Sequence, residues 1–113
     1  MGTLPEISDA TFEAEVVQAD KPVLVDFWAP WCAPCRMVAS VLEKVAEERG
    51  DALKIVKVNI DEHQEHAAKL GVMLLPTLLL YKDGKPVDKM QGSMPPRAIA
   101  AMLETNLGEP VAS

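Results

Sequence analysis

Cysteine is scarce in this sequence: only 2 of its 113 residues are cysteine, at positions 32 and 35. One such pair cannot provide the framework of several disulfides that holds small cysteine-rich domains together. A bridge across two intervening residues would also restrict the unfolded chain very little. We therefore interpret the pair as catalytic or metal-binding rather than as a structural staple.

Long hydrophobic runs and clusters of basic residues are also missing. No apolar stretch approaches the roughly 18 residues that a membrane span needs. Met1–Pro5 lacks the basic and then apolar segments of a signal peptide, so we expect a cytoplasmic protein without a membrane anchor. Acidic residues outnumber basic ones, 17 to 11, which gives a net charge of −6. This balance disfavours nucleic-acid binding.

Apolar residues make up 49% of the chain, enough for a hydrophobic core at this length. We expect a single domain over residues 1–108 and a frayed tail over residues 109–113. The residue pattern predicts, in chain order, a short strand at Glu6–Ile7, a helix from Ser8 or Asp9 to before Lys21, a strand Val23–Trp28, a helix from about Pro34 to Gly50, a strand Leu53–Ile60, a short helix Glu62–Leu70, strands Thr77–Tyr81 and Val87–Met90, and a helix from Pro95-Pro96 to Leu107.

The order of these elements predicts an α/β fold. Alternating strands and helices in the first two thirds favour parallel strands joined by right-handed crossovers. Asp83-Gly84, between the last two strands, is a strong signal for a hairpin. The sequence therefore predicts a mixed sheet with helices on both faces and an antiparallel hairpin at one edge.

Both cysteines lie in the segment Trp31–Cys35, where a strand gives way to a helix. Free backbone N–H groups at a helix start favour the anion of Cys32, whereas Cys35, one turn further in, should lack them and be more buried. Pro34 has a helix-compatible φ and no N–H, so it shapes a turn that keeps the sulfurs close. Because disulfide exchange needs an attacking thiolate and a resolving thiol, we predict Cys32 as nucleophile and Cys35 as resolver.

Other interpretations of the motif are open. His63 and His66 could complete a zinc site with the two cysteines, but their spacing and their place on a later helix argue against it, and we expect surface residues. The thiols could also be a buried apolar pair. In that case the protein would be a non-catalytic binding subunit that uses the apolar face around Trp31.

The two motifs Trp31-Cys32-Ala33-Pro34-Cys35 and Leu75-Pro76-Thr77, in this order of elements, resemble the thioredoxin family. The resemblance extends from about Ile7 to Leu107. The further residues that carry it are Asp26, Lys57, Gly84 and Gly92.

This resemblance implies a thioredoxin fold, with a five-stranded sheet in the order 1-3-2-4-5 flanked by four helices, and a cis bond at Leu75-Pro76. It implies a protein-disulfide reductase, although an oxidase or isomerase would use the same loop at another redox potential. It also implies a monomer that binds no cofactor, acts on disulfide-containing client proteins and receives electrons from NADPH through a flavin-dependent thioredoxin reductase.

Asp26 is the one acidic residue of an otherwise apolar strand. Burial there should raise its pKa, so that the carboxylate can accept the Cys35 proton, the role that the resemblance implies. The alternative is a structural acid paired with Lys57 on the neighbouring strand. Both readings can hold, and Lys57 is predicted to tune Asp26.

Four residues are predicted to bind the client. Trp31 would form part of the client-facing surface, although an aromatic beside a turn is often simply packed. By resemblance, Leu75 offers backbone hydrogen bonds to an extended peptide beside Pro76. Gly92 would allow its close approach, or would merely form a turn.

The sequence departs from the family pattern at a few positions. Ala33 replaces the usual glycine between the cysteines and should affect the redox potential. Ser40 replaces a proline, so its N–H is predicted to bond the Arg36 carbonyl and leave the helix straighter. Met73 and Leu74 could extend the apolar client surface, with core packing an equal alternative for one of them.

Overall fold

The computed structural model describes residues 4–110. The ends of the chain, including the last three residues of the predicted tail and the first three of Met1–Pro5, lie outside the described residues. The elements are β1 (Glu6–Ile7), α1 (Asp9–Phe12) with a π-helical turn (Glu13–Val17), β2 (Val23–Trp28), α2 (Ala33–Arg49) with a 3₁₀ turn (Gly50–Ala52), β3 (Lys54–Asn59), α3 (Glu65–Lys69), β4 (Thr77–Lys82), β5 (Lys85–Gln91) and α4 (Pro96–Leu107).

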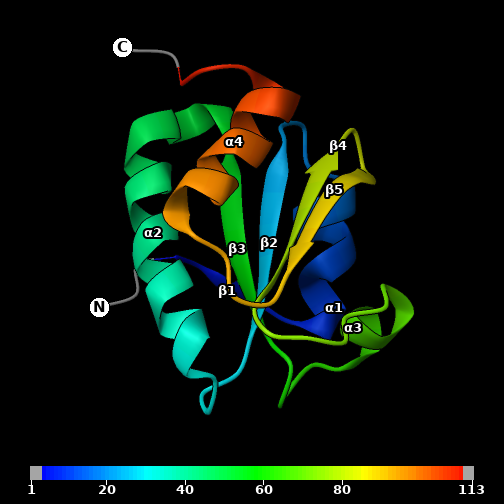
Figure 1. Ribbon diagram of the computed structural model, residues 1–113. Helices are drawn as coiled ribbons and strands as arrows, with labels where there is room; N and C mark the ends of the chain where they lie inside the picture. The colour runs from blue at the N-terminus through cyan, green and yellow to red at the C-terminus, as the bar shows by residue number, and fades with distance from the viewer. Residues whose placement is uncertain (1–3, 111–113) are drawn as a thin grey trace.

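The five strands form one mixed sheet in the order β1-β3-β2-β4-β5, which confirms the expected topology. The first three strands pair in parallel, whereas β4 runs antiparallel to both β2 and β5. Figure 1 shows α2 and α4 on one face of the sheet and α1 and α3 on the other. Along the chain, the carboxyl end of β2 is followed by the cysteine segment and the start of α2.

Alternation along β2 divides the hydrophobic core into two layers, because successive side chains of a strand point to opposite faces. Leu24 packs with Val38 and Leu42 of α2 and with residues of α4. Val25 packs in the second layer, with Phe12 of α1. Asp26 therefore lies on the same face of the sheet as Leu24, beneath α2.

Several elements differ in extent from the predictions, among them the third helix and the strands β3 and β5. The third helix is shorter than Glu62–Leu70, because residues 60–62 form a turn in which the N–H groups of Glu62 and His63 donate to the Asn59 carbonyl. Strand β3 lacks the two terminal residues of the predicted Leu53–Ile60. Strand β5 is longer, since the tight turn uses only Asp83, at φ 53°, and Gly84, at φ 78°.

Helix α2 carries a cap at each end. Cys32 is its N-cap. Gly50 is its C-cap, with a φ of 53°, a positive value that glycine adopts more readily than other residues. The helix continues without interruption through Ser40. The hydrogen bond from Ser40 to the Arg36 carbonyl stays a prediction. Within residues 4–110, no helix is long and apolar enough to cross a membrane.

Replacing Gly84 with Ala is expected to destabilise the fold by about 1–3 kcal/mol. The added Cβ would lie 2.7 Å from the Val17 carbonyl oxygen, at a residue whose φ is already +78°. Gly50→Ala is the matched control, because its φ is also positive but no atom lies within 4 Å of its Cβ position. Urea denaturation of both variants measures their unfolding free energies, and Gly84→Ala should lose more than Gly50→Ala. An equal loss in the two variants would contradict the predicted clash.

Candidate active site

The cysteine segment forms the first turn of α2. Cys32, the N-cap, has an extended backbone (φ −93°, ψ 101°), and Ala33 and Pro34 occupy the first two helical positions. A disulfide joins Cys32 to Cys35, with their Cα atoms 5.4 Å apart. The spacing of the motif thus brings the sulfur of the extended N-cap residue together with that of a residue in the first helical turn.

One backbone donor points at the Cys32 sulfur. The Cys35 N–H donates to Cys32 Sγ, with the nitrogen 3.2 Å from the sulfur. A donor in this position favours a negative charge on that sulfur once the bridge is open. The exposed fractions are 5% for Cys32 and 3% for Cys35, so the predicted contrast in burial is small while the bridge is closed.

A small apolar cluster surrounds the disulfide. Ala29 is buried against the cysteines, and Trp28, Ile60 and Leu75 pack around them. The peptide bond from Leu75 to Pro76 is cis, as the resemblance implied. The fold therefore brings the Leu75-Pro76 segment beside the cysteine pair, although the two motifs are far apart in sequence.

Asp26 is completely buried on β2, and neither of its carboxylate oxygens has a hydrogen-bond partner. Burial raises its pKa to about 7; the charge of Lys57 opposes this rise and that of Glu6 adds to it. A carboxyl of this kind exchanges its proton near neutral pH. The sequence-based prediction of a raised pKa is therefore confirmed.

Lys57 lies directly beside Asp26 in the parallel register of β2 and β3. Its ammonium nitrogen is 4.3 Å from the centre of the Trp28 ring, in a cation–π contact. Among the ion pairs of the described residues, none joins it to Asp26. The charge of Lys57 thus lowers the pKa of Asp26 without a direct ion pair between the two side chains in residues 4–110.

A small cavity of about 70 Å³ lies beside Cys35. Cys35, Lys57, Trp28 and Arg36 are among the residues that line it. Cys35, which is buried, and Lys57, which is partly buried, thus border one space.

Trp31 is held in place although 68% of it is exposed. Its indole N–H donates to Asp61 Oδ1 over 3.1 Å, and the Asp61 N–H in turn donates to Asn59 Oδ1 over 2.9 Å. Sequence reasoning missed Asp61 and Asn59. Their position at the carboxyl end of β3, next to that of β2, was the available signal, since ligand sites of α/β sheets collect there.

The other residues predicted to contact a client lie in or next to the segment 73–76. The Gly92 N–H donates to the Pro76 carbonyl over 2.8 Å, and Gly92 has φ +79°, which fits the turn interpretation. Met73 and Leu74 are 85% and 58% exposed. Core packing of either one is therefore wrong, and both remain available as apolar surface.

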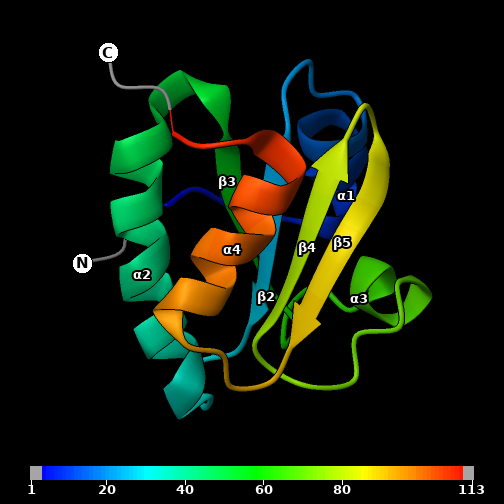
Figure 2. The same ribbon diagram turned by 45° about the horizontal axis from the view of Figure 1, so that its top comes forward.

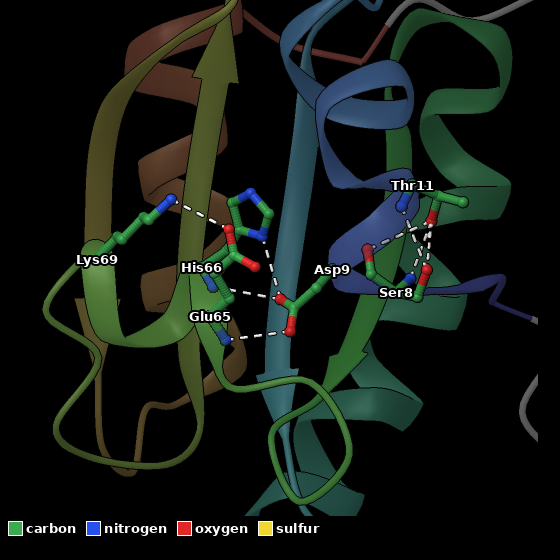
Figure 3. A network of polar contacts seen from close by, with 6 residues as sticks. All are labelled: Ser8, Asp9, Thr11, Glu65, His66 and Lys69. Atoms are coloured by element: carbon green, nitrogen blue, oxygen red, sulfur yellow. Dashed lines mark hydrogen bonds and ion pairs between the residues drawn. The ribbon is translucent and has the colours of Figure 1, made fainter.

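His66 belongs to a cluster between α1 and α3. His66 stacks on Phe12, with ring centres 4.2 Å apart, and its Nδ1 lies 3.1 Å from Asp9 Oδ1 (Figure 3). Burial acts to raise the pKa of Asp9, but hydrogen bonds from the backbone N–H groups of Glu65 and His66 and from the His66 ring leave it lowered.

The contacts of His66 with Asp9 and Phe12 join α1 to α3, so His66, which was expected at the surface of the helix, is half-buried there. His63 lies in the turn before α3 rather than on it. No group of three or more potential metal ligands occurs among residues 4–110.

Comparisons with known proteins agree with this geometry. A family model described as Thioredoxin matches residues 3–105. The chain is 46% identical to Thioredoxin 1 of Synechococcus elongatus over 107 residues, which cover 95% of this chain and all of the relative. It is 57% identical to a thioredoxin of Listeria monocytogenes over 90 residues, covering 80% and 85% of the two chains.

Proposed function

The chain belongs to the thioredoxin family and is a thiol-disulfide oxidoreductase, and from this premise we propose that it reduces the disulfides of client proteins. The observation that carries the proposal is the Cys32–Cys35 disulfide at the start of α2, with a backbone donor on one sulfur and Asp26 buried beneath the helix. In this reaction the pair starts as a dithiol and finishes as a disulfide.

The first proposed step is attack by the Cys32 thiolate. The thiolate bonds to one sulfur of the client disulfide, and the other client sulfur leaves as a thiolate. The Cys35 N–H, which donates to Cys32 Sγ, supports the negative charge before the attack. Ala33 and Pro34 are proposed to set the shape of the turn that holds this donor in place.

The second proposed step is resolution of the mixed disulfide. Cys35 gives its proton to the Asp26 carboxylate and attacks Cys32 Sγ, which releases the second client thiolate and leaves the Cys32–Cys35 bridge. A carboxyl with a pKa of about 7 is partly ionised at neutral pH and can serve as this base. Lys57 is proposed to keep that pKa from rising further.

The client is proposed to lie across the apolar surface beside the loop. Trp31, Met73 and Leu74 present exposed side chains there. An extended client segment would form backbone hydrogen bonds with Leu75, in the manner of an added strand. Pro76 and Gly92 form the floor of this path and are joined by a backbone hydrogen bond.

Two electrons must be returned to the bridge after each turnover. We propose that a flavin-dependent thioredoxin reductase supplies them from NADPH, so that sulfur is the electron carrier on this chain and no cofactor is needed. The proposed place of action is the cytoplasm, where such a reductase would keep the pair reduced. The protein is proposed to act as a monomer.

A coupled assay tests this function. The protein is mixed with NADPH, a thioredoxin reductase and a protein substrate whose chains are joined by disulfides, and loss of NADPH absorbance is followed. We expect turnover that depends on the protein and on the substrate. Cys32→Ser is the control and should reduce nothing, whereas turnover equal to that of the wild type would exclude Cys32 as the nucleophile.

A further inference from the structure

An apolar groove lies beside the cysteine loop, on the side of α2 that faces the start of α4. Pro34, Met37, Val38 and Val41 form its α2 wall, and the segment 93–96 forms the opposite wall. We call it the α2/α4 groove. Figures 1 and 2 both show the start of α4 beside the N-terminal half of α2, so the two walls adjoin in space.

We propose that the α2/α4 groove binds one large apolar side chain of the client, at a fixed distance along the client from its reactive cysteine. This inference rests on the proposed function, because it assumes a client held at the Cys32–Cys35 pair. It adds a preference for clients with an apolar residue near the reduced disulfide.

Continuity with the disulfide site identifies a client segment as the occupant. Pro34, at one end of the groove, stands between the two cysteines. Ser93 on the other wall directly follows Gly92, whose N–H is bonded to the Pro76 carbonyl. A chain attached at Cys32 and extended past Pro34 therefore reaches the groove within a few residues, since an extended chain advances about 3.3 Å per residue.

The chemistry of the walls selects an apolar side chain. Among the lining residues, no side chain is charged, and Ser93 alone carries a polar side-chain group. Pro95 and Pro96 have no backbone N–H to donate. The Pro95 carbonyl accepts the N–H groups of Ala98 and Ile99 at the start of α4. A polar client group would lose water there, with the Ser93 hydroxyl as the one polar side chain of the lining to replace it.

The size and softness of the groove indicate what it can hold. Its volume of about 210 Å³ is below the roughly 300–1,000 Å³ of pockets for small molecules, which suits one side chain. Val38 and Val41 are fixed against the core, whereas Met37 is 72% exposed at the rim. Flexible methionine side chains adapt to different apolar shapes, so the preference should be for apolar character rather than for one residue type.

The test uses a series of disulfide-linked peptides in which one leucine is placed at successive positions before and after the cysteine. The reference peptide has serine at all of these positions. We expect kcat/KM to rise roughly tenfold when the leucine reaches the groove, the scale of discrimination by a small apolar pocket. Met37→Glu should abolish this rise, and Met37→Gln should reduce it. Val87→Glu, an exposed apolar residue on β5, is the matched control and should retain the rise.

A small-molecule disulfide without a peptide separates this inference from the proposed function. The rate of each protein with this substrate is the reference against which its leucine preference is expressed. If neither protein reduces any substrate, the proposed function fails. If the wild type reduces every peptide at one rate, or the leucine preference survives in Met37→Glu, the groove proposal is overturned. Concentration-dependent dimerisation that Met37→Glu abolishes would assign the groove to a second copy of the chain and overturn it as well.

Discussion

Replacing Cys35 with Ser is expected to stop the turnover of protein disulfides and to leave the client covalently attached to Cys32. The variant retains the attacking sulfur and can complete the first exchange. It lacks the second thiol, so the mixed disulfide is not resolved from within the protein. We expect kcat with a protein substrate to fall by roughly a thousandfold or more, as for loss of a reacting group in other covalent mechanisms.

Mass spectrometry of the reaction mixture measures this outcome directly. Cys35→Ser should accumulate an adduct whose mass is the sum of the protein and one client chain, and a thiol reagent should release it. Cys32→Ser is the matched control, because it also loses one sulfur but should form no adduct. An adduct at Cys35 in that control would reverse the assigned roles, and wild-type turnover in Cys35→Ser would contradict the mechanism.

Replacing Asp26 with Asn is expected to stabilise the protein at alkaline pH by about 4 kcal/mol, because about 1.4 kcal/mol accompanies each unit of pKa difference. Burial raises the Asp26 pKa from 3.8 to about 7 in the folded protein. Between these values the folded state holds a proton that the unfolded state has lost. The wild type therefore loses stability as the pH rises from about 4 to about 7, and Asn avoids this loss.

Urea denaturation across this pH range measures the difference between the two proteins. Their unfolding free energies should nearly coincide below about pH 4, where both side chains are neutral, and should diverge up to about pH 7. Asp51→Asn, which changes an exposed carboxyl outside the core, is the control. A difference that is constant with pH would contradict a raised pKa for Asp26.

The same variant tests the proposed proton transfer. With Asn at position 26, resolution of the mixed disulfide should be slower at neutral pH while the first exchange keeps its rate. Rapid-quench measurements separate these two steps. An unchanged rate of resolution would leave Asp26 with an effect on stability alone.

The sheet and its helices could be predicted because their signals are local. Apolar runs such as Val23–Trp28 and the helical spacing in α2 follow from short stretches of sequence, and alternating elements restrict the topology. The extents of α3 and β5 were less accurate. They depend on the turn after Asn59 and on the tight Asp83-Gly84 turn, where one residue of difference changes the end of an element.

The candidate site was only partly visible in the sequence. Cys32, Cys35 and Asp26 stood out because their chemistry is unusual for their positions, whereas the proximity of Leu75-Pro76 came from the resemblance. Asp61 was missed because its bond to Trp31 joins residues 30 positions apart. The stacking of His66 on Phe12 and the α2/α4 groove likewise exist only once distant elements have packed.

The reduction potential of the Cys32–Cys35 pair tests the central claim, protein-disulfide reduction, most directly. It is obtained by equilibrating the protein in glutathione buffers of graded composition and measuring the fraction of dithiol. A reductase requires a potential at or below about −220 mV, the upper edge of the cytosolic glutathione range. A value of about −180 to −120 mV, the range of disulfide isomerases and oxidases, would contradict the claim.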